Sequence, residues 1–154
     1  MYDETDGLFV TDAMYVFSTK VDFDPWTVLA VLQSKLFLFL YRVANQGESR
    51  VIPQVKAAKL GTLPLPNFND QKVISDELST AAKNMCALNG QLGSEKSESA
   101  RNELLRRLSR TDREIDGLVY ELYGLGERER QLVDEAGVIV AEGSEVEVEE
   151  VSTV

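Results

Sequence analysis

Two runs of apolar residues with the same heptad spacing constrain the fold of this chain most strongly. In both runs the steps between successive positions are 4, 3, 4, 3 and 4 residues. The first run extends from Ile74 to Leu92 and the second from Leu104 to Leu122, with a polar break at Gly93–Ser97 between them. This pattern predicts two helices joined by a short loop and packed as an antiparallel, coiled-coil-like hairpin.

The registers of the two runs match when the chain folds back at the break. The facing pairs are Leu92 with Leu104, Leu88 with Leu108, Met85 with Thr111, Ala81 with Ile115, Leu78 with Leu118 and Ile74 with Leu122. Only the layer with Thr111 contains a polar member, so the hairpin is expected to close without a slip.

The segment before the hairpin has a mixed character. Leu8–Val10 and Ala13–Phe17 are rich in β-branched and aromatic residues, and Arg50–Val55 is a third short segment expected to be extended. Asp24 and Pro25 fit the N-cap and first position of a helix from Trp26 to Val43 that is apolar on most sides. The prolines of Leu63–Pro66 predict an extended connector.

Together these patterns predict an α+β fold. It consists of a small mixed region of short strands with one buried helix, then the hairpin, then a short C-terminal helix over 128–136. Gly124 is placed to end the second hairpin helix. The predicted units are 1–66, 67–136 and 137–154, and the glutamates of the last favour a disordered tail over an edge strand.

The charge balance excludes several classes of function. With 16 basic and 26 acidic residues the net charge is −10, so nucleic acid can be bound only through a local basic patch. The chain has no histidine and one cysteine, Cys86, which excludes a Ser-His-Asp triad, a histidine base, a disulfide within the chain and a cysteine zinc site. An acidic start without a leader predicts a cytoplasmic protein, and Val28–Val43 is too short and too charged to span a bilayer.

Catalytic motifs are also missing. The sequence contains no Gly-rich phosphate loop, no Gly-X-Ser-X-Gly elbow and no calcium loop. Asp112 and Asp116 lie one turn apart on a helix rich in arginine, where surface ion pairs are the usual outcome. We therefore expect no catalytic residues and no metal ligands in this chain.

The remaining candidates are binding residues. A basic stretch interleaved with amides offers groups that can contact phosphates and base edges, although such a stretch is also common on ordinary protein surfaces. Its candidate DNA contacts are Lys35, Arg42, Arg50, Gln54, Lys56 and Lys59. A second set, Arg106, Arg110 and Arg113, shares one helical face, which is more typical of a solvated surface than of a phosphate-binding stripe.

Three blocks of sequence resemble one protein family. Asp112–Leu125, with its Tyr-Glu-Leu-Tyr-Gly-Leu ending, resembles the C-terminal end of TaqI-like specificity domains. These domains occur in adenine-specific DNA methyltransferases and type IIG restriction-modification enzymes. Val31–Phe37 is similar to the family's "LNSKLF" helix, and Ile52–Val55 followed by Leu63–Pro66 is similar to its "PQ…LPIP" passage.

The resemblance implies a DNA-binding role without catalysis. In that family a separate domain holds S-adenosylmethionine and flips the target adenine. Its Asn-Pro-Pro-Tyr motif is missing here, so no cofactor is expected in this chain. Residues 1–66 would then be part of a target-recognition domain that binds double-stranded DNA and works with a methyltransferase domain or subunit in trans. The alternative is a helical-hairpin structural module that forms homodimers and does not bind DNA.

Overall fold

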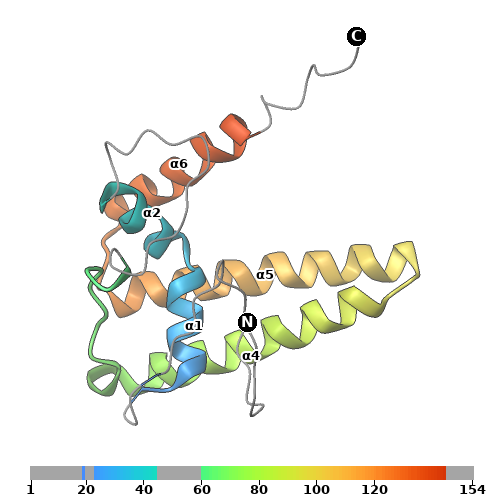
Figure 1. Cartoon of the computed structure of the whole chain (residues 1–154), viewed down its shortest axis with the longest axis horizontal. Helices are drawn as coiled ribbons and strands as arrows, with labels where there is room; N and C mark the ends of the chain where they lie inside the picture. The colour runs from blue at the N-terminus through green and yellow to red at the C-terminus, as the bar shows by residue number, and fades with distance from the viewer. Residues whose placement is uncertain (1–18, 20–22, 45–59, 145–154) are drawn as a thin grey trace.

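A computed structural model of the protein describes residue 19 and residues 23–44 and 60–144 (Figure 1). Every regular element in these residues is a helix, and no strand forms among them. The α+β prediction is therefore wrong for the described part of the chain, which is all-α. The segments expected to form strands, Leu8–Val10, Ala13–Phe17 and Arg50–Val55, lie outside the described residues.

The helical hairpin is confirmed. Helix α4 (Lys72–Ser94) and helix α5 (Glu98–Leu122) run antiparallel and are joined by a three-residue loop. Ser97 caps α5 by accepting a hydrogen bond from the backbone of Ala100. All twelve seam residues are buried or partly buried. The polar layer is satisfied because the Asn84 side-chain amide donates to the Thr111 hydroxyl at 3.3 Å.

The single helix predicted over Trp26–Val43 is instead two helices. Helix α1 (Pro25–Gln33) and helix α2 (Lys35–Ala44) meet at Ser34 with a bend of 65°. Ser34 is extended, and its buried hydroxyl donates to the Val31 carbonyl and accepts from the Phe37 backbone N–H. It thus closes one helix and opens the next, which a pattern of apolar spacing does not reveal.

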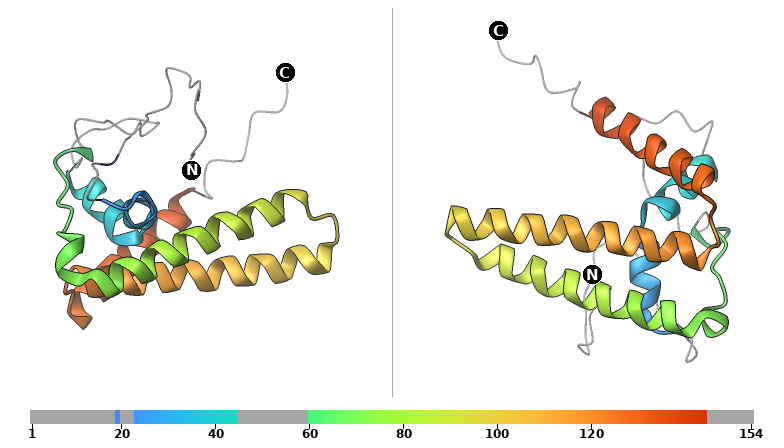
Figure 2. Two further views of the ribbon diagram at one scale, coloured as in Figure 1. Left: turned by 90° about the horizontal axis from the view of Figure 1, so that it is seen from below. Right: turned by 180° about the vertical axis from the view of Figure 1, so that it is seen from behind.

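Helix α1 packs across the open end of the hairpin, near the start of α4 (Figure 2). Its N-cap is confirmed: Asp24 accepts hydrogen bonds from the Thr27 backbone and hydroxyl. The Thr27 hydroxyl also lies 2.9 Å from the Ser75 carbonyl, which ties α1 to α4. The far end of the hairpin projects beyond the other described helices.

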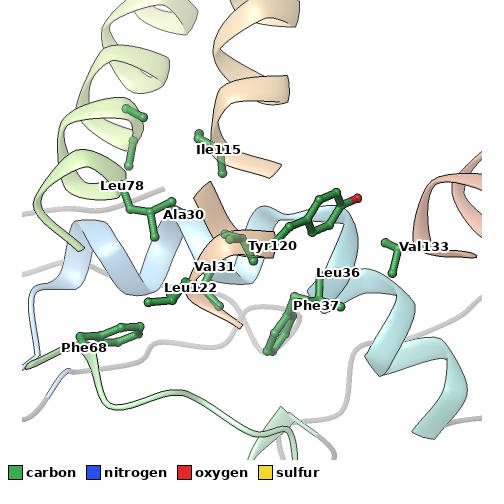
Figure 3. Close-up of a cluster of buried hydrophobic side chains, with 13 residues drawn as sticks. Ala30, Val31, Leu36, Phe37, Phe68, Leu78, Ile115, Tyr120, Leu122 and Val133 are labelled. Atoms are coloured by element: carbon green, nitrogen blue, oxygen red, sulfur yellow. The ribbon is translucent and has the colours of Figure 1, made fainter. Parts of the chain in front are cut away.

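The main core lies where α1 and α2 meet the base of the hairpin (Figure 3). Val31 and Leu78 are completely buried, and Ile115 is nearly so. Phe68 enters this core from the 3-10 helix η1 (Phe68–Gln71) and meets the Phe23 ring edge-on at 5.6 Å. The core therefore joins both ends of the described chain to the hairpin.

The end of α5 is fixed by a Schellman motif at Gly124. Gly124 has a φ of +66°, and its N–H donates to the Glu121 carbonyl. The Leu125 N–H donates to the Tyr120 carbonyl, which completes the motif. Helix α6 (Glu127–Ser144) follows and packs on α2, and its helix extends eight residues past the predicted end at Ala136. Residues 145–154 of the predicted tail lie outside the described residues.

Replacing Gly124 by alanine is expected to destabilise the protein by about 1 kcal/mol, since a Cβ is disfavoured in the left-handed region. Gly90→Ala is the matched control, because Gly90 is an exposed residue of α4 with open space around its Cα. That change should stabilise the helix by about 0.5–1 kcal/mol. Thermal unfolding followed by circular dichroism measures both, and a shift of the same sign in the two variants would contradict the assignment of the cap.

Among the described residues no single helix is both long and apolar enough to cross a membrane, and only α1 and α2 taken together across their 65° bend reach that length and composition.

Candidate nucleic-acid interface

The structure places two of the six predicted DNA contacts. Lys35 and Arg42 lie seven residues apart on α2, so they occupy the same face of that helix. The other four, Arg50, Gln54, Lys56 and Lys59, lie outside the described residues. The described part of the predicted interface is therefore one face of α2.

Lys35 takes part in an ion-pair network that joins three helices. Its ammonium lies 3.4 Å from the Asp116 carboxylate on α5 and 3.3 Å from the Asp134 carboxylate on α6. Its backbone N–H, in the first turn of α2, donates to Asp116 at 2.9 Å. The Lys35 side chain keeps 42% of its surface exposed, but its charge is balanced by two acids of the same chain.

Asp116 is buried, which the prediction of a surface ion pair did not foresee. Its residue surface is 5% exposed, and its carboxylate caps the N-terminus of α2 across 81 positions of sequence. Burial raises the pKa of Asp116, and the nearby Lys35 opposes that shift without cancelling it. For Lys35, burial lowers the pKa, but the pull of Asp116 and Asp134 outweighs it and the net shift is upward.

Tyr120 extends the network towards α6. Its hydroxyl donates to the Asp134 carboxylate at 2.9 Å, and the Arg130 guanidinium lies 5.9 Å from the centre of its ring. Figure 3 shows the Tyr120 ring between α5 and α6, on the side where Val133 is buried. Burial, together with the hydrogen bond to Asp134, raises the pKa of Tyr120, so its hydroxyl stays a donor at neutral pH. The network joins α2, α5 and α6.

Residues of the three sequence blocks meet at this end of the hairpin. Lys35 of the first block pairs with Asp116 of the third. Tyr123, also of the third block, donates from its hydroxyl to the Pro64 carbonyl of the Leu63–Pro66 connector at 2.8 Å. Burial raises the pKa of Tyr123 to about 12, which keeps this donor protonated. The Ile52–Val55 part of the second block lies outside the described residues.

Helix α5 has a second face, opposite its apolar seam. The residues on this face recur at steps of four and three, as those of the seam do, and they are Asn102, Arg106, Ser109, Arg113, Asp116 and Tyr120. At the base of the hairpin, Asp116 and Tyr120 on this face contact residues of α2 and α6. Nearer the tip, an open depression on α5 is lined by Asn102, Leu105, Arg106, Ser109 and Arg113.

Sequence reasoning missed the junction because its partners are distant in the sequence. From the sequence, Lys35 is predicted to contact DNA and Asp116 to form surface ion pairs. The two residues lie 81 positions apart, so no local spacing pattern connects them. The second face of α5 did carry a signal, since its positions repeat the seam spacing half a helical turn away.

No protein-family model, curated protein or solved structure matches this chain.

Proposed function

We propose that this chain is the DNA-binding, target-recognition portion of a restriction-modification adenine-specific DNA methyltransferase. It acts together with a catalytic domain or subunit that holds S-adenosylmethionine and performs the methyl transfer. The chain itself supplies phosphate and base contacts to double-stranded DNA from its basic stretch. The helical hairpin carries this surface and spaces it from the catalytic partner.

One observation carries this proposal: residues from the blocks that resemble TaqI-like specificity domains contact one another. The pairs are Lys35 with Asp116, and Tyr123 with Pro64, and each joins segments more than fifty residues apart. Contacts of this kind restrict which residues a fold accepts at those positions. The blocks that resemble TaqI-like specificity domains therefore include residues whose contacts join α2 and the Leu63–Pro66 connector to α5 and its C-terminal end.

The predicted DNA contacts have different roles in this arrangement. The ammonium of Lys35 pairs with Asp116 and Asp134. Lys35 therefore supports the DNA-binding surface by positioning α2. Arg42, two turns further along α2, extends the same face. The remaining predicted contacts, Arg50, Gln54, Lys56 and Lys59, belong to the segment that directly follows α2 in sequence.

A charge-reversal experiment tests the proposal. The Lys56→Glu/Lys59→Glu double variant of the full chain should lose duplex binding by roughly 10-fold or more in a fluorescence anisotropy titration at low salt. The matched control is Lys72→Glu/Arg128→Glu, which changes the net charge equally at the exposed first turns of α4 and α6. Equal losses in both variants would mean that only the net charge matters and would count against a defined interface.

The helical-hairpin oligomerisation module is the rival function. Two features favour it: the hairpin projects beyond the core, and exposed apolar side chains, Leu105 on α5 and Val73 on α4, lie on its surface. Sedimentation velocity with and without duplex DNA separates the two. A tight homodimer whose sedimentation ignores DNA supports the rival, whereas a monomer that sediments with DNA supports the proposed function.

A further inference from the structure

The outer part of the hairpin has a local excess of positive charge. Between Leu78 and Arg113, seven basic and four acidic residues give this part of the hairpin a net charge of +3 in a protein whose total is −10. Three of its arginines, Arg106, Arg110 and Arg113, lie on one side of α5 within two turns of helix. A local excess of this kind is the electrostatic footprint of a surface that binds anions.

The arginines face away from the seam. Arg106 and Arg113 line the open depression on α5, together with the polar side chains of Asn102 and Ser109. All residues of the depression come from α5, and the far end of the hairpin projects beyond the other described helices (Figures 1 and 2). In the part of the chain that the structure describes, this depression is formed by α5 alone and lies open to a large partner.

Local ion pairs leave most of this charge available. Arg106 forms an ion pair with Glu103 at 3.4 Å, and its side chain is 80% exposed. Such an exposed pair is weak and exchanges readily. Arg113 uses its Nε atom on the Ser109 carbonyl at 3.1 Å, which aligns the guanidinium along the helix surface. Arginine in a fixed orientation is well suited to phosphate because its N–H groups can bind two oxygens at once.

The arginine face lies on the same side of α5 as the N-terminus of α2. The stripe that begins with Asn102 and Arg106 continues at the base of the hairpin with Asp116 and Tyr120. Asp116 binds Lys35, so the N-terminus of α2 adjoins the same side of α5 as the arginines. A rod-like polyanion lying along this side would meet the arginine face beyond the α2 junction.

From these observations we propose that Arg106, Arg110 and Arg113 of α5 form a second, sequence-independent contact with the phosphate backbone of double-stranded DNA. This inference rests on the proposed DNA-binding function and extends it from the basic stretch to the hairpin. The side chains of Asn102 and Ser109, which line the same depression, add hydrogen-bond donors that position the duplex without reading bases. In this proposal the hairpin both spaces the two domains and binds the phosphate backbone of the duplex.

The test compares two variants with equal net charge. Arg106→Gln/Arg110→Gln/Arg113→Gln removes the proposed contact, and Lys72→Glu/Arg128→Gln makes the same change in net charge at exposed positions of α4 and α6 outside the basic part of the hairpin. Binding of the full chain to a fluorescein-labelled mixed-sequence duplex is followed by anisotropy from roughly 50 to 200 mM salt. Circular dichroism checks that both variants keep the helical content of the unmodified chain.

The proposed contact makes a quantitative prediction. The arginine variant should bind roughly 10-fold or more weakly at low salt, and its slope of log affinity against log salt should shrink by about 2 to 3, while the control keeps its slope. Equal slopes in the arginine variant and the unmodified chain would overturn this inference and leave the proposed function standing. A chain that binds no DNA at low salt would overturn both.

A protein partner is the remaining outcome. If the arginine variant alters only the sedimentation of the chain, and its DNA affinity is unchanged, then the face contacts a second copy of this acidic chain and the phosphate contact is wrong. The Lys56→Glu/Lys59→Glu variant completes the comparison. A chain in which that variant keeps its DNA affinity and the arginine variant loses it would uphold the hairpin contact and reject the basic stretch.

Discussion

Replacing Leu78 by alanine is expected to lower the free energy of unfolding by about 3 kcal/mol. Leu78 has no exposed surface and lies in the hairpin seam, in the cluster that also contains Val31 of α1 and Ile115 of α5. Its removal would leave a cavity where α1 crosses the hairpin, because the surrounding helices are tied to one another by hydrogen bonds and cannot collapse freely.

Leu105→Ala is the matched control for this prediction. Leu105 lies on the outer surface of α5 with 48% of its surface exposed, so the same truncation should change stability by less than about 0.5 kcal/mol. Urea unfolding followed by circular dichroism measures both midpoints, and the slopes should remain equal if the unfolded states are alike. Similar losses in the two variants would contradict the assignment of the core.

Replacing Asp116 by alanine is expected to cost about 2 kcal/mol. The change removes the acceptor for the Lys35 backbone N–H and the buried partner of the Lys35 ammonium. Asp134 still faces that ammonium, and the Lys35 side chain stays partly hydrated, so the loss is smaller than for a fully buried pair. Unfolding of the variant by urea, with the same optical signal, gives the value.

Asp116→Asn separates the helix cap from the charge. Asparagine keeps an oxygen for the Lys35 N–H and cannot ionise, so it should cost less than alanine. The pH dependence adds a check. The pKa of Asp116 is higher in the folded protein than its ordinary value of 3.8, so the folded state holds this proton more tightly. Lowering the pH from neutral towards 3.8 should therefore favour the wild type relative to Asp116→Asn, and a difference independent of pH would contradict a buried carboxylate.

The hairpin could be predicted from sequence because its information is local. Heptad spacing, the polar break at Gly93–Ser97 and Gly124 each act within a few residues, and the structure confirms the two helices and the left-handed glycine. The N-cap at Asp24 follows the same rule.

The break between α1 and α2 could not be predicted in this way. Leu32 and Leu36 lie four residues apart on either side of the break, so the apolar spacing indicates one continuous helix. The bend depends on Ser34, which binds both helices, and on Asp116, which caps α2 from α5. A serine in an apolar helix is ordinary by itself, and its effect becomes visible only when the distant carboxylate is known.

The candidate interface was predicted only in part for a similar reason. The sequence shows where basic residues cluster, but it does not show which of them form ion pairs with acidic residues in the folded protein. Lys35 is held by Asp116 and Asp134, whereas Arg106 and Arg113 line an open surface of α5. The steps of four and three residues from Arg106 to Arg110 to Arg113 are visible in the sequence, but which face of α5 packs against α2 is not.

The salt dependence of duplex binding by the unmodified chain is the sharpest test of whether this protein binds DNA through its basic stretch and α5. With contacts from both, we expect measurable binding at roughly 50 mM salt and a slope of log affinity against log salt of about −4 or steeper. A chain that fails to bind duplex DNA at that salt concentration, or that binds with an affinity independent of salt, would contradict it.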